Sequence, residues 1–276
     1  MPNADAIVLR TIDFSETSLI VTLYTREFGK IEGLAKGGRR LKSPFESALD
    51  ILARIRVTFL QKRGDALDLL TESKLVRRFK VERHNLAGLY GAYYVVELVD
   101  ALTEPGDPNP AIYDITAKLL TRLEEGTFVM RSLIRFEGLF LRQIGHQPSF
   151  RSCVECGKAI DPDAAEKHHR RIAFGLLEGG VICSRCMTEL RQTGQGGLKI
   201  YLSPAALKGY EQLTDPKDRS ENWKRIPLDS NLLGEIRGLN NQYISHLLGR
   251  KPRLFDYLKF ISERDRSLEA GVGSQE

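Results

Sequence analysis

The stretch S-L-I-V-T-L-Y-T-R-E-F-G-K-I-E-G-L-A-K, residues 18–36, decides the fold of the N-terminal part of the chain. Apolar and polar residues alternate in its first half, which places Leu19, Val21 and Leu23 on one face of a strand. The segment R-E-F-G-K then predicts a turn in which Gly29 supplies a permissive backbone, and K-I-E-G-L-A-K predicts the returning strand. The stretch therefore predicts a β-hairpin.

Three more strand-like runs flank this hairpin. They are D-A-I-V-L-R-T-I (5–12), I-L-A-R-I-R-V-T-F-L (51–60) and D-A-L-D-L-L-T-E-S-K-L-V (65–76). Five short strands joined by tight turns within about 75 residues are typical of a small closed barrel such as an oligonucleotide-binding (OB) fold. A small β-sandwich is the alternative that this pattern leaves open.

From about residue 84 the apolar spacing changes from that of strands to that of helices. Aromatic residues in the first and third of these helices could line a ligand pocket, but packing between helices explains them more simply. These residues are Tyr90, Tyr93, Tyr94, Phe136 and Phe140. The expected helices cover residues 85–102, 111–126, 128–145 and 230–249, and one more begins with Ser203 as N-cap and Pro204 in its first turn.

The four cysteines form two C-x2-C pairs, Cys153 with Cys156 and Cys183 with Cys186. Each pair offers two thiolates at the spacing that a tetrahedral metal needs, so the two pairs together complete the ligand set of a structural zinc ion. Because four thiolates leave no open position, this zinc would not be catalytic. His168 and His169 lie between the pairs and could replace a thiol, although solvated surface histidines are the simpler interpretation.

Composition and charge narrow the classes of function. The chain of 276 residues is 42% hydrophobic and 28% charged, which is typical of a globular protein. It contains no apolar run long enough to span a membrane, and its N-terminus lacks the basic and apolar segments of a signal peptide, so we expect a cytoplasmic location. Residues 1–80 hold 15 Lys and Arg against 10 Asp and Glu, and the remaining 196 residues hold 26 of each. The basic surplus therefore belongs to the predicted barrel and indicates a polyanionic partner.

The segment A-K-G-G-R-R-L-K-S, residues 35–43, carries much of this surplus. Its adjacent glycines lack the four-residue gap of a phosphate-binding P-loop, so we interpret it as a flexible basic loop for nucleic-acid phosphates. Phe14, Tyr24 and Phe28 are candidates either for stacking on bases or for the barrel core. The candidate DNA-binding cations are Arg10, Lys36, Arg39, Arg40, Lys42, Lys62, Arg63, Lys74 and Arg77.

No motif of enzyme chemistry accompanies these features. No serine stands in a nucleophile setting such as G-x-S-x-G, and His146 in I-G-H-Q-P fits a helix-end role better than catalysis. We therefore expect a protein without catalytic residues. A zinc-dependent or nucleotide-using enzyme would need an open metal position or a phosphate loop, and neither is seen in the sequence.

With its parts in this order, the chain resembles the RecO family of bacterial DNA-repair proteins. The likeness is carried by residues 6–43, by the two C-x2-C pairs and by the late helix ending H-L-L-G-R-K-P-R. It spans nearly the whole chain and is most specific in the first forty residues. One departure is Gly38 in K-G-G-R-R, where alanine would be more usual; the turn itself is unaffected.

The resemblance implies an α+β chain with an N-terminal OB-fold barrel, a helical domain and an inserted zinc module. It also implies binding of single- and double-stranded DNA, annealing of complementary strands, including strands coated by single-strand-binding protein (SSB), association with RecR and help in loading RecA. An interaction adaptor based on the helical domain is the alternative function. The expected domains are residues 1–80 (barrel), 81–149 (first helical part), 150–192 (zinc module), 193–266 (second helical part) and 267–276 (disordered tail).

Overall fold

The computed structural model of the chain describes residues 1–40, 43–45, 48–62, 64, 66–194, 197–218 and 220–258. The chain divides into two compact units, Met1–Val129 and Met130–Glu276. The tail predicted to be disordered, residues 267–276, lies outside the described residues. Among the described residues, no helix is long and apolar enough to cross a membrane.

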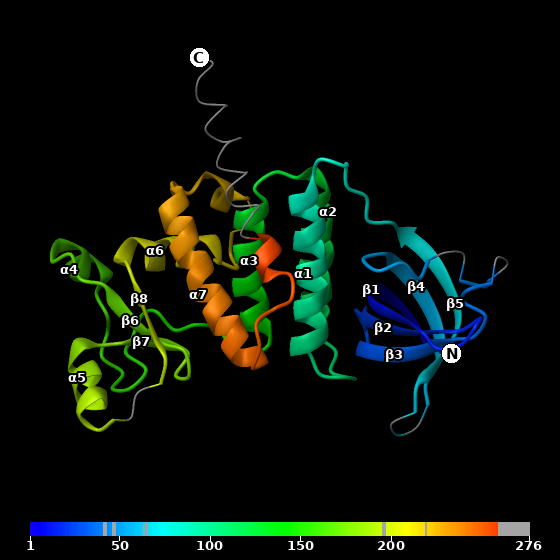
Figure 1. Ribbon diagram of the computed structural model, residues 1–276, viewed down its shortest axis with the longest axis horizontal. Helices are drawn as coiled ribbons and strands as arrows, with labels where there is room; N and C mark the ends of the chain where they lie inside the picture. Colours follow the sequence, from blue (N-terminus) through cyan, green and yellow to red (C-terminus); the bar gives the residue numbers. More distant parts are fainter. Residues whose placement is uncertain are drawn as a thin grey trace, which may run out of the picture. The chain divides into compact units, whose positions relative to one another are not determined.

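A closed five-stranded barrel forms the first part of unit 1 (Figure 1). The strand order is β1-β2-β3-β5-β4, and every neighbouring pair is antiparallel except β3 and β5, which are parallel. This order confirms the OB-like barrel and excludes the sandwich. The strands are β1 (Asn3–Asp13), β2 (Leu19–Thr25), β3 (Gly29–Ala35), β4 (Arg54–Leu60) and β5 (Asp68–Arg77).

Alternating side chains fill the barrel interior. Val21 and Leu23 of the predicted hairpin are fully buried there, together with Ile55 and Phe59 of β4. A register shift in β1 between Val8 and Arg10, and others in β4, interrupt the ladders. Such bulges bend and twist strands, which a barrel of only five strands needs in order to close.

Two helices, α1 (Leu86–Leu102) and α2 (Pro110–Glu125), complete unit 1. The side chain of Asn85 accepts a hydrogen bond from the backbone N–H of Gly88 and so caps α1. Asn109 caps α2 in the same way, Pro110 occupies the first turn of α2, and Gly126 ends that helix in the left-handed conformation. The caps explain why the proline-rich segment separates these helices so sharply.

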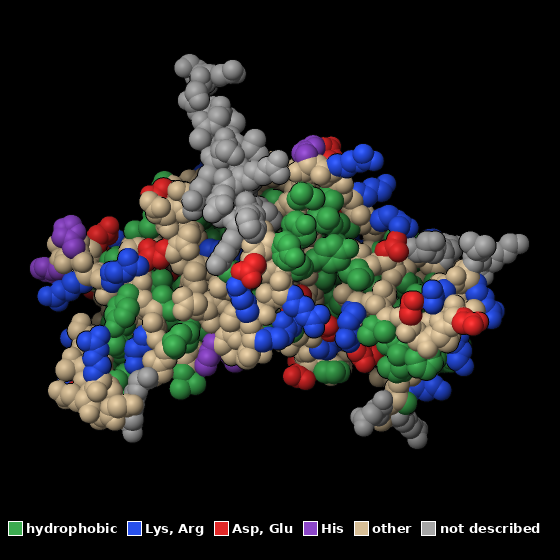
Figure 2. Space-filling view, in the orientation of Figure 1, with side chains coloured by type: hydrophobic (Ala, Val, Ile, Leu, Met, Phe, Trp, Pro, Cys, Tyr) green, Lys and Arg blue, Asp and Glu red, His purple; other side chains and the backbone are tan. Residues whose placement is uncertain are grey.

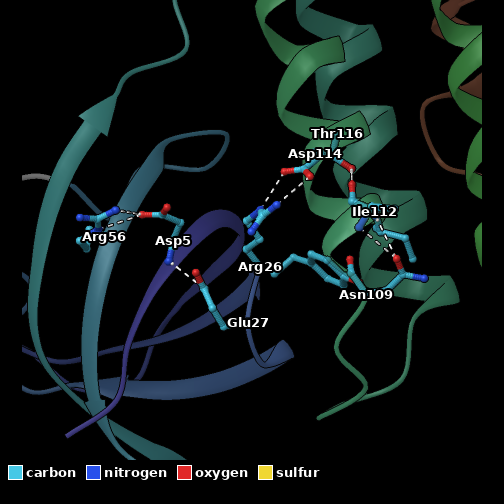
Figure 3. A network of polar contacts seen from close by, with 10 residues as sticks. Asp5, Arg26, Glu27, Arg56, Asn109, Ile112, Asp114 and Thr116 are labelled. Carbon is cyan, nitrogen blue, oxygen red and sulfur yellow. Dashed lines mark hydrogen bonds and ion pairs between the residues drawn. The ribbon is translucent and has the colours of Figure 1, made fainter.

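Polar contacts fix α1 and α2 against the outer side of the barrel. Arg26, just after β2, donates two hydrogen bonds to the carboxylate of Asp114 in α2 at 3.0 and 3.1 Å (Figure 3). The Nζ of Lys30 donates to the backbone oxygen of Asp100 at 2.6 Å. The compact unit therefore extends to Val129, past the change from strands to helices. The expected domain boundary at residue 80 follows that change in secondary structure and stays a prediction.

Unit 2 combines helices with a small sheet. Its three-stranded sheet has the order β7-β6-β8 (Figure 1). The carboxylate of Glu137 in α3 is fully buried and pairs with Arg237 and Asn240 of α7. The elements are α3 (Val129–Gln143), α4 (Pro162–Lys167), β6 (Ile172–Gly175), β7 (Gly180–Ile182), α5 (Ser184–Gln192), β8 (Lys199–Leu202), α6 (Pro204–Leu213), a 3-10 helix (Asn222–Arg225) and α7 (Ser230–Leu248).

Three aromatic residues of the predicted helices serve packing, whereas Tyr93 is 37% exposed. Tyr94 is fully buried in unit 1. In unit 2, Phe136 and Phe140 are buried and their rings stack with centroids 5.5 Å apart. These three side chains belong to helix cores rather than to an open pocket.

We predict that Gly29→Ala destabilises the protein much more than Gly64→Ala. Both glycines have a left-handed backbone, with φ of 68° and 67°, so each substitution carries a strain of about 1 kcal/mol. At Gly29 the new Cβ would also clash with the backbone oxygen of Asp107, whereas at Gly64 it meets no described atom within 4 Å. Denaturant unfolding should show an extra loss of at least about 2 kcal/mol for Gly29→Ala. Equal losses would contradict this close contact between the β2–β3 turn and the segment before α2.

Candidate nucleic-acid interface and metal centre

The basic segment forms a turn directly after β3. Gly37 has a φ of 74°, and the backbone N–H of Arg40 donates to its carbonyl at 3.0 Å. The backbone N–H of Arg39 donates to the carbonyl of Thr17 at 3.1 Å, so the turn lies against the loop that joins β1 to β2. We call Lys36, Arg39 and Arg40 the basic turn; Lys42, predicted with them, lies outside the described residues.

The three cations of the basic turn are all exposed, but they differ in their partners. Arg39 pairs with the carboxylate of Asp13 at 3.1 Å and also donates to the backbone oxygen of Ser15 at 3.3 Å. Lys36 and Arg40 have no carboxylate partner among the described residues. These two side chains therefore present the most available positive charge of the turn.

Two of the other predicted cations are engaged by carboxylates. Arg10 pairs with Glu32 at 3.0 Å and with Asp100 at 3.7 Å. Arg77 pairs with Glu124 of α2. Both arginines thus hold parts of unit 1 together, and their charge is largely balanced where they lie.

The remaining predicted cations lie on β5 and after β4. Lys62 and Lys74 are exposed, and their side-chain ammonium groups have no carboxylate partner within the described ranges, although the backbone N–H of Lys62 donates to Asp68 at 2.8 Å. Arg63 falls outside those ranges. The structure therefore brings Lys36, Arg39 and Arg40 together on one turn, and their contact with DNA stays a prediction.

The three aromatic candidates of the barrel have different surroundings. Phe14 is 60% exposed in the β1–β2 loop, beside the basic turn. Phe28 packs edge-on against Phe59 at 5.5 Å, and Tyr24 is buried with its hydroxyl donating to the backbone oxygen of Asn109 at 3.3 Å. Only Phe14 of these three is placed to stack on a base.

The four cysteine thiols converge in unit 2. Their sulfur atoms all lie within 4.8 Å of one another, and the Sγ atoms of Cys156 and Cys183 are 3.8 Å apart. Ligands about 2.3 Å from a tetrahedral zinc would have sulfurs about 3.8 Å apart, so the set fits such an ion. Gly157, with a φ of 72°, bends the first pair, and the second pair begins α5 with Cys183 as N-cap.

The local environment acts on two of these thiols in opposite directions. Burial alone would raise the pKa of Cys153, but backbone N–H groups of Cys183, Cys156 and Glu155 donate to its sulfur and together lower that pKa to about 7. Burial raises the pKa of Cys186. A bound divalent cation favours the thiolate form of every ligand, so the cluster is compatible with a structural metal site. His168 and His169 are exposed and outside this cluster.

Comparison with known proteins identifies the family. The family model described as recombination protein O N terminal matches residues 1–79, and the model of recombination protein O C terminal matches residues 83–254. The chain belongs to the RecO family. The two RecO matches together cover the barrel and both helical parts.

Relatives named DNA repair protein RecO are similar over most of their length. The protein from Rhodopirellula baltica is 37% identical, with 92% of this chain and 97% of the relative covered. Those from Myxococcus xanthus and Symbiobacterium thermophilum are each 32% identical, covering 92% and 94% of this chain and 95% and 96% of the relatives. Membership in the RecO family implies a role in DNA repair and recombination.

Tyr24 gives a pH-dependent test of how the barrel meets α2. Burial and the nearby charge of Asp107 raise the pKa of this phenol from 10.0 to about 12. Between these values the unfolded chain has lost a proton that the folded protein keeps, so the free energy of unfolding falls as pH rises through the window. Tyr24→Phe should reduce this fall by about 1 to 2 kcal/mol in denaturant titrations. Identical pH profiles for the two proteins would contradict the buried position of Tyr24.

Proposed function

We propose that this RecO-family chain binds single- and double-stranded DNA and anneals complementary strands, including strands coated by SSB. The observation that carries the proposal is the basic turn, whose Lys36 and Arg40 are exposed and lack carboxylate partners among the described residues. The family and the basic surplus of residues 1–80 both support a polyanionic ligand.

Annealing follows from charge neutralisation. Cations that contact phosphates release counterions and bind any sequence, so affinity falls steeply with salt. A surface that neutralises two strands lowers their mutual repulsion while leaving base edges free to pair. The basic turn, with Lys62 and Lys74 as further contacts, is proposed to supply this surface, and no bond is made or broken in the process.

The partners proposed for this function follow the RecO likeness. RecR would associate with the chain, SSB would be met on coated strands, and RecA would be loaded afterwards onto gapped DNA. These partners place the proposed function in the bacterial cytoplasm, at the nucleoid. No enzymatic step is part of the proposal.

We propose that Cys153, Cys156, Cys183 and Cys186 hold one structural zinc ion. Four thiolates at tetrahedral spacing support zinc over oxygen-preferring cations, and they leave no position for substrate. The ion would fix the β6–β7 hairpin and the start of α5 to the segment around Cys153.

The double variant Lys36→Glu/Arg40→Glu tests the DNA-binding surface. We expect its affinity for a single-stranded oligonucleotide to fall at least about tenfold, and the slope of log affinity against log salt to decrease by about 2, because two phosphate contacts are lost. Arg39 is left unchanged, since reversing its charge beside Asp13 would disturb the β1–β2 loop. Fluorescence anisotropy across a salt series measures both quantities.

Lys118→Glu/Lys217→Glu is the matched control, because it makes the same change of net charge at two exposed lysines that are not part of the basic turn, one in α2 and one in unit 2. The control should keep its affinity within about twofold. Equal losses in the two variants would show that net charge alone, and not the basic turn, governs binding. Unchanged affinity of Lys36→Glu/Arg40→Glu at low salt would overturn the assignment.

Metal analysis tests the cysteine cluster separately. The purified protein should contain about one zinc per chain. Cys183→Ser/Cys186→Ser should remove the zinc and lower the thermal stability of unit 2, while affinity for DNA changes less than about threefold because the basic turn lies in unit 1. A metal-free wild-type protein with the same stability as the variant would contradict a structural zinc.

A further inference from the structure

Five apolar residues lie side by side on the five adjacent strands of the barrel. The strand registers pair Ile12 with Ile20, Ile20 with Leu34, Leu34 with Leu69 and Leu69 with Leu60. Directly opposed residues on neighbouring strands point to the same side of a sheet, so these five side chains form one continuous line. We call these five residues the apolar row.

The apolar row faces outward. The residues next to the row in sequence are also paired across the strands, from Leu19 through Ala35 and Leu70 to Phe59. These residues pack in the barrel core. Since successive residues of a strand point to opposite faces of the sheet, the apolar row, one residue away on each strand, must point to the outside. The two ends of the row confirm this direction, because Ile12 is 46% exposed and Leu60 is 37% exposed.

Positive charge and one aromatic ring lie beside the apolar row. Lys36 follows Leu34 by two residues and begins the basic turn, and Phe14, which is 60% exposed, follows Ile12 by two residues. On the opposite side the ion pair of Arg10 and Glu32 forms a polar border. Figure 2 shows hydrophobic side chains gathered on the surface over β3, with Lys and Arg side chains close by.

We infer that the apolar row and Phe14 contact the exposed base faces of single-stranded DNA while the basic turn binds its phosphates. This inference rests on the proposed DNA binding and adds to it a preference for unpaired bases. A single strand offers both chemistries that the surface presents, apolar base faces and an anionic backbone. A duplex buries its base faces between stacked pairs, so it gains only the contacts of the cations.

Two oligonucleotides of equal length separate these contacts. A thymidine oligonucleotide and an abasic oligonucleotide carry the same phosphates, and only the first carries bases. Wild-type protein should bind the thymidine oligonucleotide about tenfold more tightly, since contact with one base is worth a factor of this size. Ile12→Thr/Phe14→Ala should lose this difference and bind both oligonucleotides as wild type binds the abasic one.

The variant changes the two most exposed side chains at this surface, and threonine preserves strand propensity, so the fold should survive. Leu34→Thr is a second, independent variant with the same expected loss. The matched control is Val76→Thr, at a 62% exposed side chain of β5 outside the apolar row, which should keep the wild-type preference. Affinity for duplex DNA and the salt slope should stay at wild-type values in all variants, because no phosphate contact is removed.

The possible outcomes separate base contact by the apolar row from phosphate binding by the basic turn. Equal wild-type affinity for the two oligonucleotides overturns the base contact and leaves phosphate binding intact. Variants that keep the wild-type preference show that the bases lie elsewhere, and they overturn the assignment of base contact to the apolar row. Failure of wild type to bind any of these DNAs overturns the inference and the proposed function together.

Discussion

Three residue pairs between parallel strands close the barrel, and the candidate DNA-binding surface depends on them. Gly33, Leu34 and Ala35 of β3 pair with Asp68, Leu69 and Leu70 of β5. A Cβ at Gly33 would clash with the side chain of Leu70, so any other residue there would displace Leu70 from its place in the barrel core. This register aligns Leu34 with Leu69 on the outside of the barrel, and β3 ends immediately afterwards, which places the basic turn at the border of the apolar row.

The helices of unit 1 divide the barrel surface into two regions of different charge. Where α1 and α2 cover β1 and β2, the cations of the barrel pair with helix groups, as Arg26 does with Asp114 and Lys30 with Asp100. Beyond the helices, Lys36 has no carboxylate partner within the described part of the chain. The location of the surplus positive charge of residues 1–80 therefore depends on which cations pair with carboxylates, and not only on where the cations lie in the sequence.

Local patterns made much of this structure predictable from the sequence. The strands of the barrel carry their own alternation and turns, and the two C-x2-C pairs specify a converging ligand set without knowledge of the fold. Ion pairs between residues distant in the sequence were not predictable. Arg77, expected to contact DNA, instead pairs with Glu124, and this pairing depends on where α2 packs. The same packing decides that Tyr24 is buried and Phe14 exposed, although both are aromatic residues in or beside the first hairpin. The apolar row was missed because it exists only once the registers of all five strands are known.

The central claim is that DNA lies on the barrel at the basic turn and the apolar row. Photocrosslinking of the full chain to a single strand that carries a photoreactive uracil, followed by mass spectrometry of the crosslinked peptides, tests it most directly. The account predicts crosslinks concentrated in residues 11–40, with Phe14 among the modified side chains. Crosslinks confined to unit 2, with none in the barrel, would contradict it.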